Sequence, residues 1–227
     1  MVAKAVKRQV PATSGAEGAS EALLPRRRRV NKDDVLREAT RLFAEKGYDG
    51  LTMGELATRV GLRKASLFHH FPTKDALYER VLGTLIETVH GVVSTALAAE
   101  GPILDRLDTL SDTLTASLGE HPHAARLLVG EAVHGGALMR EILGDKVDMV
   151  LGAAREFVRA GQREGVFDRE LDPTHVVLTL VSAHFLPFAI EDIVERFAGT
   201  APSHTAFVGA RTVAVREQVR RMLGARR

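Results

Sequence analysis

The chain has 227 residues, of which 45% are hydrophobic and 26% charged, ordinary values for a globular protein of one large or two small domains. It contains no cysteine, which excludes disulfide bonds and thiolate metal sites. It has no run of 18 apolar residues and no secretory signal, so we expect a cytoplasmic protein with no membrane span.

The net charge of +2 is distributed unevenly along the chain. Residues 1–80 hold 16 Lys and Arg against 10 Asp and Glu, a balance of +6, and the remaining 147 residues hold 15 against 19, a balance of −4. A basic module suits nucleic acid, because neutralising phosphates releases their counterions. A solvated basic tail would give the same composition.

The N-terminal residues show no hydrophobic periodicity and are rich in Ala, Gly and Ser, so we predict a disordered arm over residues 1–30. Four arginines, Arg26 to Arg29, close this arm just before the first helical pattern. In homeodomain-like proteins, arms in this position enter the minor groove. Arg28 and Arg29 are therefore candidate DNA contacts, with a solvated tail as the alternative.

From residue 31 onward the apolar spacing predicts an all-α chain of about nine helices. Asn31 or Asp33 can cap the first. Thr52 and Glu55, spaced as a capping box, should begin the second, and Thr73 should cap the fourth. The bounds we predict for these helices are 31–47, 53–60, 64–70 and 73–99.

Five further helices should form a second body. Gly101-Pro102, Gly135-Gly136 and Gly165 separate the first of them. Pro187 should kink the fourth of the five. The bounds we predict are 103–118, 122–134, 138–164, 173–197 and 203–223.

Helix 53–60, the turn at Gly61 and helix 64–70 have the size of a helix-turn-helix. Such a unit lays its second helix in the DNA major groove. Leu67 and Phe71 should dock that helix on a small core. The side chains that should project outward, toward base edges and phosphates, are Arg63, Lys64, Ser66 and His69.

The segment from Val35 to Leu82 resembles the DNA-binding domain of the tetracycline-repressor (TetR) family. Three elements carry the resemblance, namely LFAEKGY at 42–48, TMGELATRVG at 52–61 and LFHHFPTKDAL at 67–77. The rest of the chain is similar only in size and helix count. The resemblance implies a protein that is not an enzyme, with a DNA-binding domain over residues 31–78 and a ligand-binding and dimerisation domain over 79–227.

Two positions depart from the family pattern. Residue 63 is commonly Ser, which caps the recognition helix, whereas Arg63 has no oxygen for that role and is available to DNA. Residue 68 is often Tyr, whose hydroxyl can donate a hydrogen bond to a phosphate. Phe68 has no hydroxyl and cannot make that bond. We take Thr52 and Lys74 as phosphate contacts, with a plain cap and a solvated charge as alternatives. The predicted DNA contacts are Thr52, Arg63, Lys64, Ser66, Phe68, His69, Lys74, Arg28 and Arg29.

The second body offers apolar and histidine side chains for a small-molecule pocket, although the same residues could form plain core. Glu131 and His134 have a spacing that bundle metal sites use and, with His184, make an alternative metal site. Scattered histidines are more often polar anchors or caps, so we predict no metal and no other cofactor. The candidate pocket residues are Leu110, Leu128, His134, Met139, Leu143, Met149, Phe157, His184, Phe185 and Phe188.

The predicted helix 173–197 is apolar on nearly every side and should be buried all round, which favours a second subunit covering one face. The last helix repeats apolar residues at sevenfold spacing. Together they favour an isologous four-helix seam in a homodimer. The residues predicted for this seam are Val177, Val181, Val208, Val215, Val219 and Met222.

These features predict a homodimeric transcriptional regulator, a repressor released from a palindromic double-stranded DNA operator by a small apolar effector. Effector binding would shift the helix 73–99 and the spacing of the two DNA-binding heads. Two other classes stay open, a helical-bundle metalloenzyme using Glu131, His134 and His184, and an architectural DNA binder without a ligand cavity. No HExxH motif or phosphate-binding glycine loop supports an enzyme.

Overall fold

A computed structural model describes residues 31–134 and 137–225, and for residues 137–143 it describes the backbone alone. The described chain is all-α, as predicted, and contains ten helices. These are α1 (Lys32–Gly50), α2 (Met53–Arg59), α3 (Lys64–His70), α4 (Lys74–Ala98), α5 (Ile103–Glu120), α6 (Pro122–Val133), α7 (Ala137–Arg163), α8 (Pro173–Ala189), α9 (Glu191–Ala198) and α10 (Thr205–Met222).

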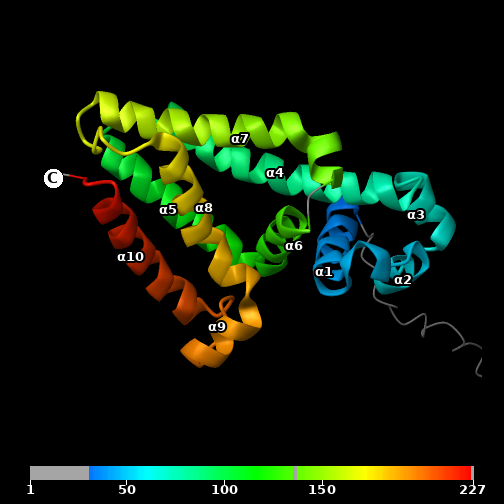
Figure 1. Ribbon diagram of the computed structural model, residues 1–227. Helices are drawn as coiled ribbons and strands as arrows, with labels where there is room; N and C mark the ends of the chain where they lie inside the picture. The colour runs from blue at the N-terminus through cyan, green and yellow to red at the C-terminus, as the bar shows by residue number, and fades with distance from the viewer. Residues whose placement is uncertain (1–30, 135–136, 226–227) are drawn as a thin grey trace, which may run out of the picture.

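The helices form two bodies joined by one long helix (Figure 1). Helices α1, α2 and α3 gather at one end of the molecule, and α4 runs from them alongside α7 into the second body. Helices α5, α8 and α10 complete that body, while α6 packs against both α1 and α8. By length and composition alone α4 is apolar enough to cross a membrane, but here it packs against α1, α5 and α7.

The first body is built around residues from all four N-terminal helices. Leu42, Leu56, Leu67 and Leu77 are each at most 1% exposed, so α1 to α4 share one core. Phe43 packs edge-on against Tyr78, with ring centroids 4.7 Å apart. The hydrophobic periodicity of each helix therefore converges on a core small enough to leave the outer face of α3 in solvent.

The second body is held together by close helix contacts and by ion pairs between α5 and α10. Arg220 donates from Nε to Asp108 at 2.8 Å, and Arg216 donates from Nε to Asp112 at 3.2 Å. At Gly119 the two helices approach so closely that a Cβ would lie 2.5 Å from Val208. These contacts fix α10 along α5 inside one chain.

The predicted single helix over 173–197 is wrong, because α8 and α9 are separate helices bent by 80° at Ile190. Pro187 has no backbone N–H, so the carbonyl of Ala183 loses its helical donor. Arg211 of α10 supplies a replacement, with its Nη2 2.5 Å from that oxygen. The proline effect was foreseen, but the kink became a complete break three residues later.

A buried histidine links α8 to α5. The side chain of His184 is 4% exposed; its Nδ1 lies 2.8 Å from the carbonyl oxygen of Leu180 and its Nε2 3.1 Å from the hydroxyl of Ser111. Because a carbonyl only accepts, Nδ1 carries the proton and Nε2 accepts from Ser111. Burial lowers the pKa of His184 below its ordinary value, which the nearby carbonyl only partly opposes.

This histidine should make the protein less stable in acid. The unfolded chain binds the proton near pH 6.5, whereas the folded chain resists it, so the free energy of unfolding should fall as pH drops below that value. Because a single proton is involved, this slope is at most about 1.4 kcal/mol per pH unit. Urea unfolding between about pH 8 and pH 5 measures it. His184→Gln should flatten the slope, and His175→Gln, exposed on the same helix, should leave it unchanged; equal slopes in all three proteins would contradict the assignment.

Candidate nucleic-acid interface

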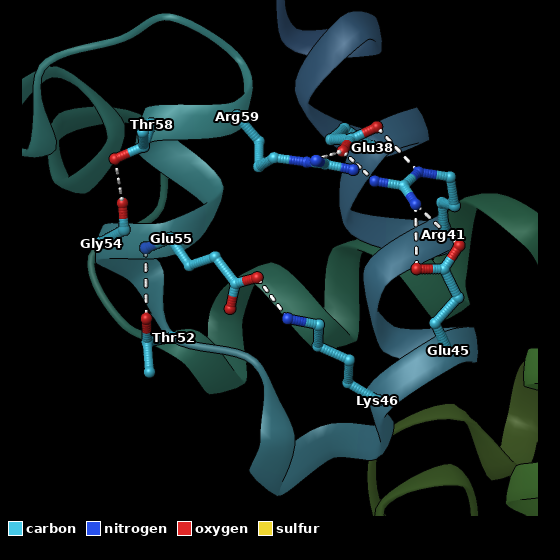
Figure 2. Close-up of polar contacts among 9 residues, drawn as sticks. All are labelled: Glu38, Arg41, Glu45, Lys46, Thr52, Gly54, Glu55, Thr58 and Arg59. Atoms are coloured by element: carbon cyan, nitrogen blue, oxygen red, sulfur yellow. Dashed lines mark hydrogen bonds and ion pairs between the residues drawn. The ribbon is translucent and has the colours of Figure 1, made fainter.

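Helix α2 begins at a half-formed capping box. The hydroxyl of Thr52 accepts from the backbone N–H of Glu55 at 3.1 Å, as predicted. The carboxylate of Glu55 does not return to the backbone of Thr52, because it forms an ion pair with Lys46 at the end of α1 instead (Figure 2). The reciprocal box lies one helix earlier, where Asn31 and Asp34 cap α1. Thr52 therefore caps α2 and stays exposed.

Ion pairs among Glu38, Arg41, Glu45 and Arg59 hold α2 against α1, and we call this group the clamp. Arg41 donates to Glu38 at 2.5 Å and to Glu45 at 2.7 Å, and Arg59 of α2 donates to Glu38 at 3.1 Å (Figure 2). The hydrogen bond from Arg41, with a smaller contribution from Arg59, holds the pKa of Glu38 below its ordinary value. Glu38 thus joins the two helices, and its side chain is only 25% exposed. This network fixes where α2 presents the turn that follows it.

The turn between α2 and α3 depends on glycine. Gly61 has φ +70°, a backbone conformation that residues with a side chain rarely adopt. The N–H of Leu62 then donates back to the carbonyl oxygen of Ala57 at 2.9 Å. Arg63 then occupies the cap of α3, and within the described chain it makes no side-chain capping bond, as its chemistry predicted. Its guanidinium is exposed.

Helix α3 presents one buried and several exposed side chains. Leu67 is fully buried, and Phe71, which follows the helix, is 5% exposed. Phe68 is 37% exposed, and the ammonium of Lys64 lies 5.7 Å from its ring centroid. The predicted outward residues are all exposed, and they are Arg63, Lys64, Ser66 and His69. The outer face of α3 therefore carries two cations, a hydroxyl and an imidazole beside an aromatic ring.

The start of α4 adds a further cation beside α3. Lys74 is partly exposed, with its ammonium 4.3 Å from the ring centroid of Tyr48 and 3.5 Å from the carbonyl oxygen of Asp49. The hydroxyl of Tyr48 donates to Asp75, and this hydrogen bond raises the pKa of Tyr48 to about 12. Arg28 and Arg29 lie outside the described residues.

The candidate pocket residues differ in their exposure in the described structure. Leu110 lines a cleft of about 430 Å³ between α4 and α5. Met149 is 53% exposed and His134 is exposed, whereas Leu128 is partly buried. The side chains of Met139 and Leu143 lie outside the description. The remaining members are buried in the packed core, and they are Phe157, His184, Phe185 and Phe188.

The residues of the alternative metal site are separated. Glu131 accepts from the hydroxyl of Tyr78 at 2.6 Å, His184 bonds Ser111, and the Nδ1 of His134 lies 2.7 Å from the carbonyl oxygen of Gly130. Among the side chains that the structure describes, residues 31–134 and 144–225, no group of three His, Asp or Glu could hold a metal ion. The helical spacing of Glu131 and His134 was misleading. Glu131 bonds Tyr78 of α4, whereas His134 bonds the backbone of its own helix.

The predicted dimer residues divide into two groups. Val177, Val215 and Val219 are at most 3% exposed and belong to the core of their own chain, so they are not available to a partner. Val208 and Met222 are partly buried, and Val181 is 40% exposed. The apolar spacing did not indicate which side chains of α8, α9 and α10 remain exposed to solvent. These are Leu178, Leu186, Ile193, Phe197 and Val213, which are 46–94% exposed.

Comparisons with known proteins agree with this arrangement. Residues 35–81 match the family described as bacterial regulatory proteins, tetR family, and residues 104–219 match the tetracyclin repressor-like C-terminal domain. The chain is 37% identical over 62 residues to the biofilm operon icaADBC HTH-type negative transcriptional regulator IcaR of Staphylococcus aureus (strain Newman), a match that covers 27% of this chain and 33% of that protein. It thus spans about a third of the length of the curated relatives it matches.

Two solved structures share the fold over most of both chains. The TetR family transcriptional regulator PfmR of Thermus thermophilus has a TM-score of 0.66 at 21% identity, covering 82% of this chain and 97% of that one. AibR, solved with isovaleryl coenzyme A and operator DNA, has a TM-score of 0.60 at 17% identity, covering 82% and 96%. At these identities the likeness concerns the fold alone.

Proposed function

We propose a specific role for this chain, which belongs to the TetR family of bacterial regulatory proteins and is a DNA-binding transcriptional regulator. It is a cytoplasmic repressor that binds a palindromic operator as a homodimer and leaves it when a small apolar effector binds. Its DNA-binding domain is residues 31–78 and its ligand-binding and dimerisation domain residues 79–227. The repressor assignment is supported by IcaR, which is described as a negative regulator.

The orientation of α3 carries the proposal. Because Leu67 is buried and Lys64 and Ser66 face solvent, the exposed face of α3 can enter a major groove without unfolding the core. Lys64 and Ser66 read base edges, while the N-terminal arm with Arg28 and Arg29 follows the minor groove. Around them, the side chains that hold the phosphates or flank the duplex are Thr52, Arg63, Phe68, His69 and Lys74.

Helix α4 transmits the effector signal in this proposal. Its first turns belong to the DNA-binding core, and its later turns pack against α5 and α7. Tyr78 on α4 bonds Glu131 on α6, so the two helices move together. An effector that prefers one angle of α4 shifts the distance between the two copies of α3, and only its differential affinity for the two states can do so. The effector site within the C-terminal body stays a prediction.

The proposal is tested by selecting bound DNA from a random pool with the full-length chain. We expect an enriched palindrome whose half-sites are separated by about one helical turn, roughly 10 base pairs, since each subunit presents one α3. Candidate apolar effectors are then added to the selected complex, and the proposal expects one class to release the DNA. A pool that yields no palindrome after repeated selection would rule out a homodimer that recognises a palindromic operator.

A further inference from the structure

We propose that a cleft between the DNA-binding domain and the C-terminal body binds an organic cation with an apolar body, and specifically an alkylammonium. The cleft has a volume of about 580 Å³ and lies between α1, α4 and the turn from α5 to α6. That volume is in the range of small-molecule sites. None of the residues predicted for the effector pocket lines it, so it is a different site from the one proposed above.

The floor of this interdomain cleft is apolar. Val81 of α4 is 1% exposed and Ala124 of α6 is 8% exposed, so both are already covered by the two bodies. Leu36 and Leu85 are partly buried, and Pro122 begins α6 beside them. An alkyl chain laid on Leu36, Leu85 and Pro122 would leave water for an apolar surface, which favours a ligand with a hydrocarbon part.

The charges around the cleft favour a cation. Arg41 is neutralised by its carboxylate partners on α1, and Arg37 is paired with Asp34 at 2.7 Å. Asp33 and Glu120 also line the cleft, are exposed, and form no ion pair with any other described residue. Among the residues that the structure describes, the cleft therefore has two carboxylates without counterions and no unpaired arginine, so it attracts a positive group and repels a negative one.

His123 lines the cleft, but one of its ring nitrogens is buried beneath the surface. The Nδ1 atom of His123 is out of contact with solvent and has no hydrogen bond within the described chain. Because this atom is not on the cleft surface, the ammonium of a ligand in the cleft would pair with the exposed carboxylates of Asp33 and Glu120 instead. The C-terminal end of α5 and the N-terminal end of α6 meet at His121, and their opposite dipoles offset each other there.

A ligand in this cleft would contact the clamp that positions α2. Glu38 and Arg41 form part of the cleft wall, and Glu38 is the residue that Arg59 of α2 bonds (Figure 2). Helix α6, at the opposite wall, is joined to α4 through Glu131 and Tyr78. A ligand in the cleft would therefore change the position of the helix-turn-helix relative to the C-terminal body. This consequence, unlike binding itself, rests on the proposed function.

Calorimetry on the full-length chain without DNA tests the site with three probes of equal chain length: octylammonium, 1-octanol and octanoate. We expect octylammonium to bind about tenfold more tightly than 1-octanol, because one favourable charge contact of ordinary size changes the affinity by that factor. Octanoate should bind more weakly than either. Octanoate binding as tightly as octylammonium, or 1-octanol matching it, would overturn the proposal.

Paired variants locate the site. Asp33→Asn combined with Glu120→Gln should lower the affinity for octylammonium about tenfold and leave that for 1-octanol unchanged, because shape is kept while charge is removed. Glu100→Gln, at the separate cleft between α4 and α5, should have no effect. An unchanged affinity in the double variant, or an equal loss in the control, would refute the location. Since no DNA is present, failure here and failure of operator selection are separate results.

Discussion

Replacing Val213 with glutamate should convert the chain to a monomer and lower its affinity for the operator about a thousandfold, the usual gain from linking two half-site contacts. Val213 is 68% exposed on α10, and the neighbouring Ala210 and Ala214 are exposed as well. On α8, Leu178 and Val181 are 55% and 40% exposed. A surface of this kind suits a symmetric helix pairing, in which each substitution occurs twice and places two carboxylates in an apolar seam.

The variant leaves the fold of one chain intact, because Val213 does not belong to its core. Sedimentation equilibrium gives the mass, and titration of the selected operator gives the affinity. Val133→Glu is the matched control: Val133 is 76% exposed at the end of α6 and lies outside the proposed seam, so this variant should stay dimeric. A Val213→Glu protein that remains a dimer would show that the seam lies elsewhere.

The exposure of individual side chains on α8 and α10 explains what the sequence could and could not predict. Helix α8 is apolar on almost every side, so its pattern indicates burial all round but not which side faces a partner. Val177 and Leu178 are adjacent and about 100° apart on the helix, yet one is 3% and the other 55% exposed. The sevenfold repeat on α10 is real, but Val215 lies in the chain's own core.

The helix-turn-helix was predicted much more closely, for reasons that are local. The predicted bounds of α3 agree with the structure, and those of α2 differ by one residue, because a cap at Thr52 and a glycine at 61 fix both ends within a few residues. The clamp on α2 was beyond prediction, since Glu38 and Arg59 are 21 residues apart in sequence. Local chemistry specified the recognition unit, and tertiary packing specified how it is held.

The effector pocket is hard to place from sequence for a different reason. A buried phenylalanine has the same sequence pattern whether it lines a cavity or fills one. Phe157 packs against Phe167 with ring centroids 6.3 Å apart, and the guanidinium of Arg106 lies 5.5 Å from its ring centroid. The interdomain cleft, in contrast, is made by the meeting of α1, α4 and the turn from α5 to α6, which no single periodicity encodes.

Replacing Lys64 with alanine should change the preferred operator sequence and weaken binding. A lysine that donates to a base edge contributes about 1–3 kcal/mol of discrimination, and a palindrome contains the contact twice, so the loss on the selected site should reach about 2–6 kcal/mol. The measurement is a second selection from the random pool with the variant, followed by titration of both operators. The variant should accept other bases at one symmetric pair of operator positions, because Lys64 is exposed in the first turn of α3 and each subunit presents it once.

Lys74→Ala separates base reading from phosphate binding and makes the Lys64 result interpretable. Lys74 begins α4 rather than α3, and its ammonium lies 4.3 Å from the ring centroid of Tyr48. Its loss should weaken all sequences alike and reduce the slope of log affinity against log salt by roughly 0.9 for each of the two subunits, with the motif unchanged. If Lys64→Ala behaved in that same way, with an unaltered motif and a flatter slope, Lys64 would be a phosphate contact, and base recognition would have to come from Ser66 or His69.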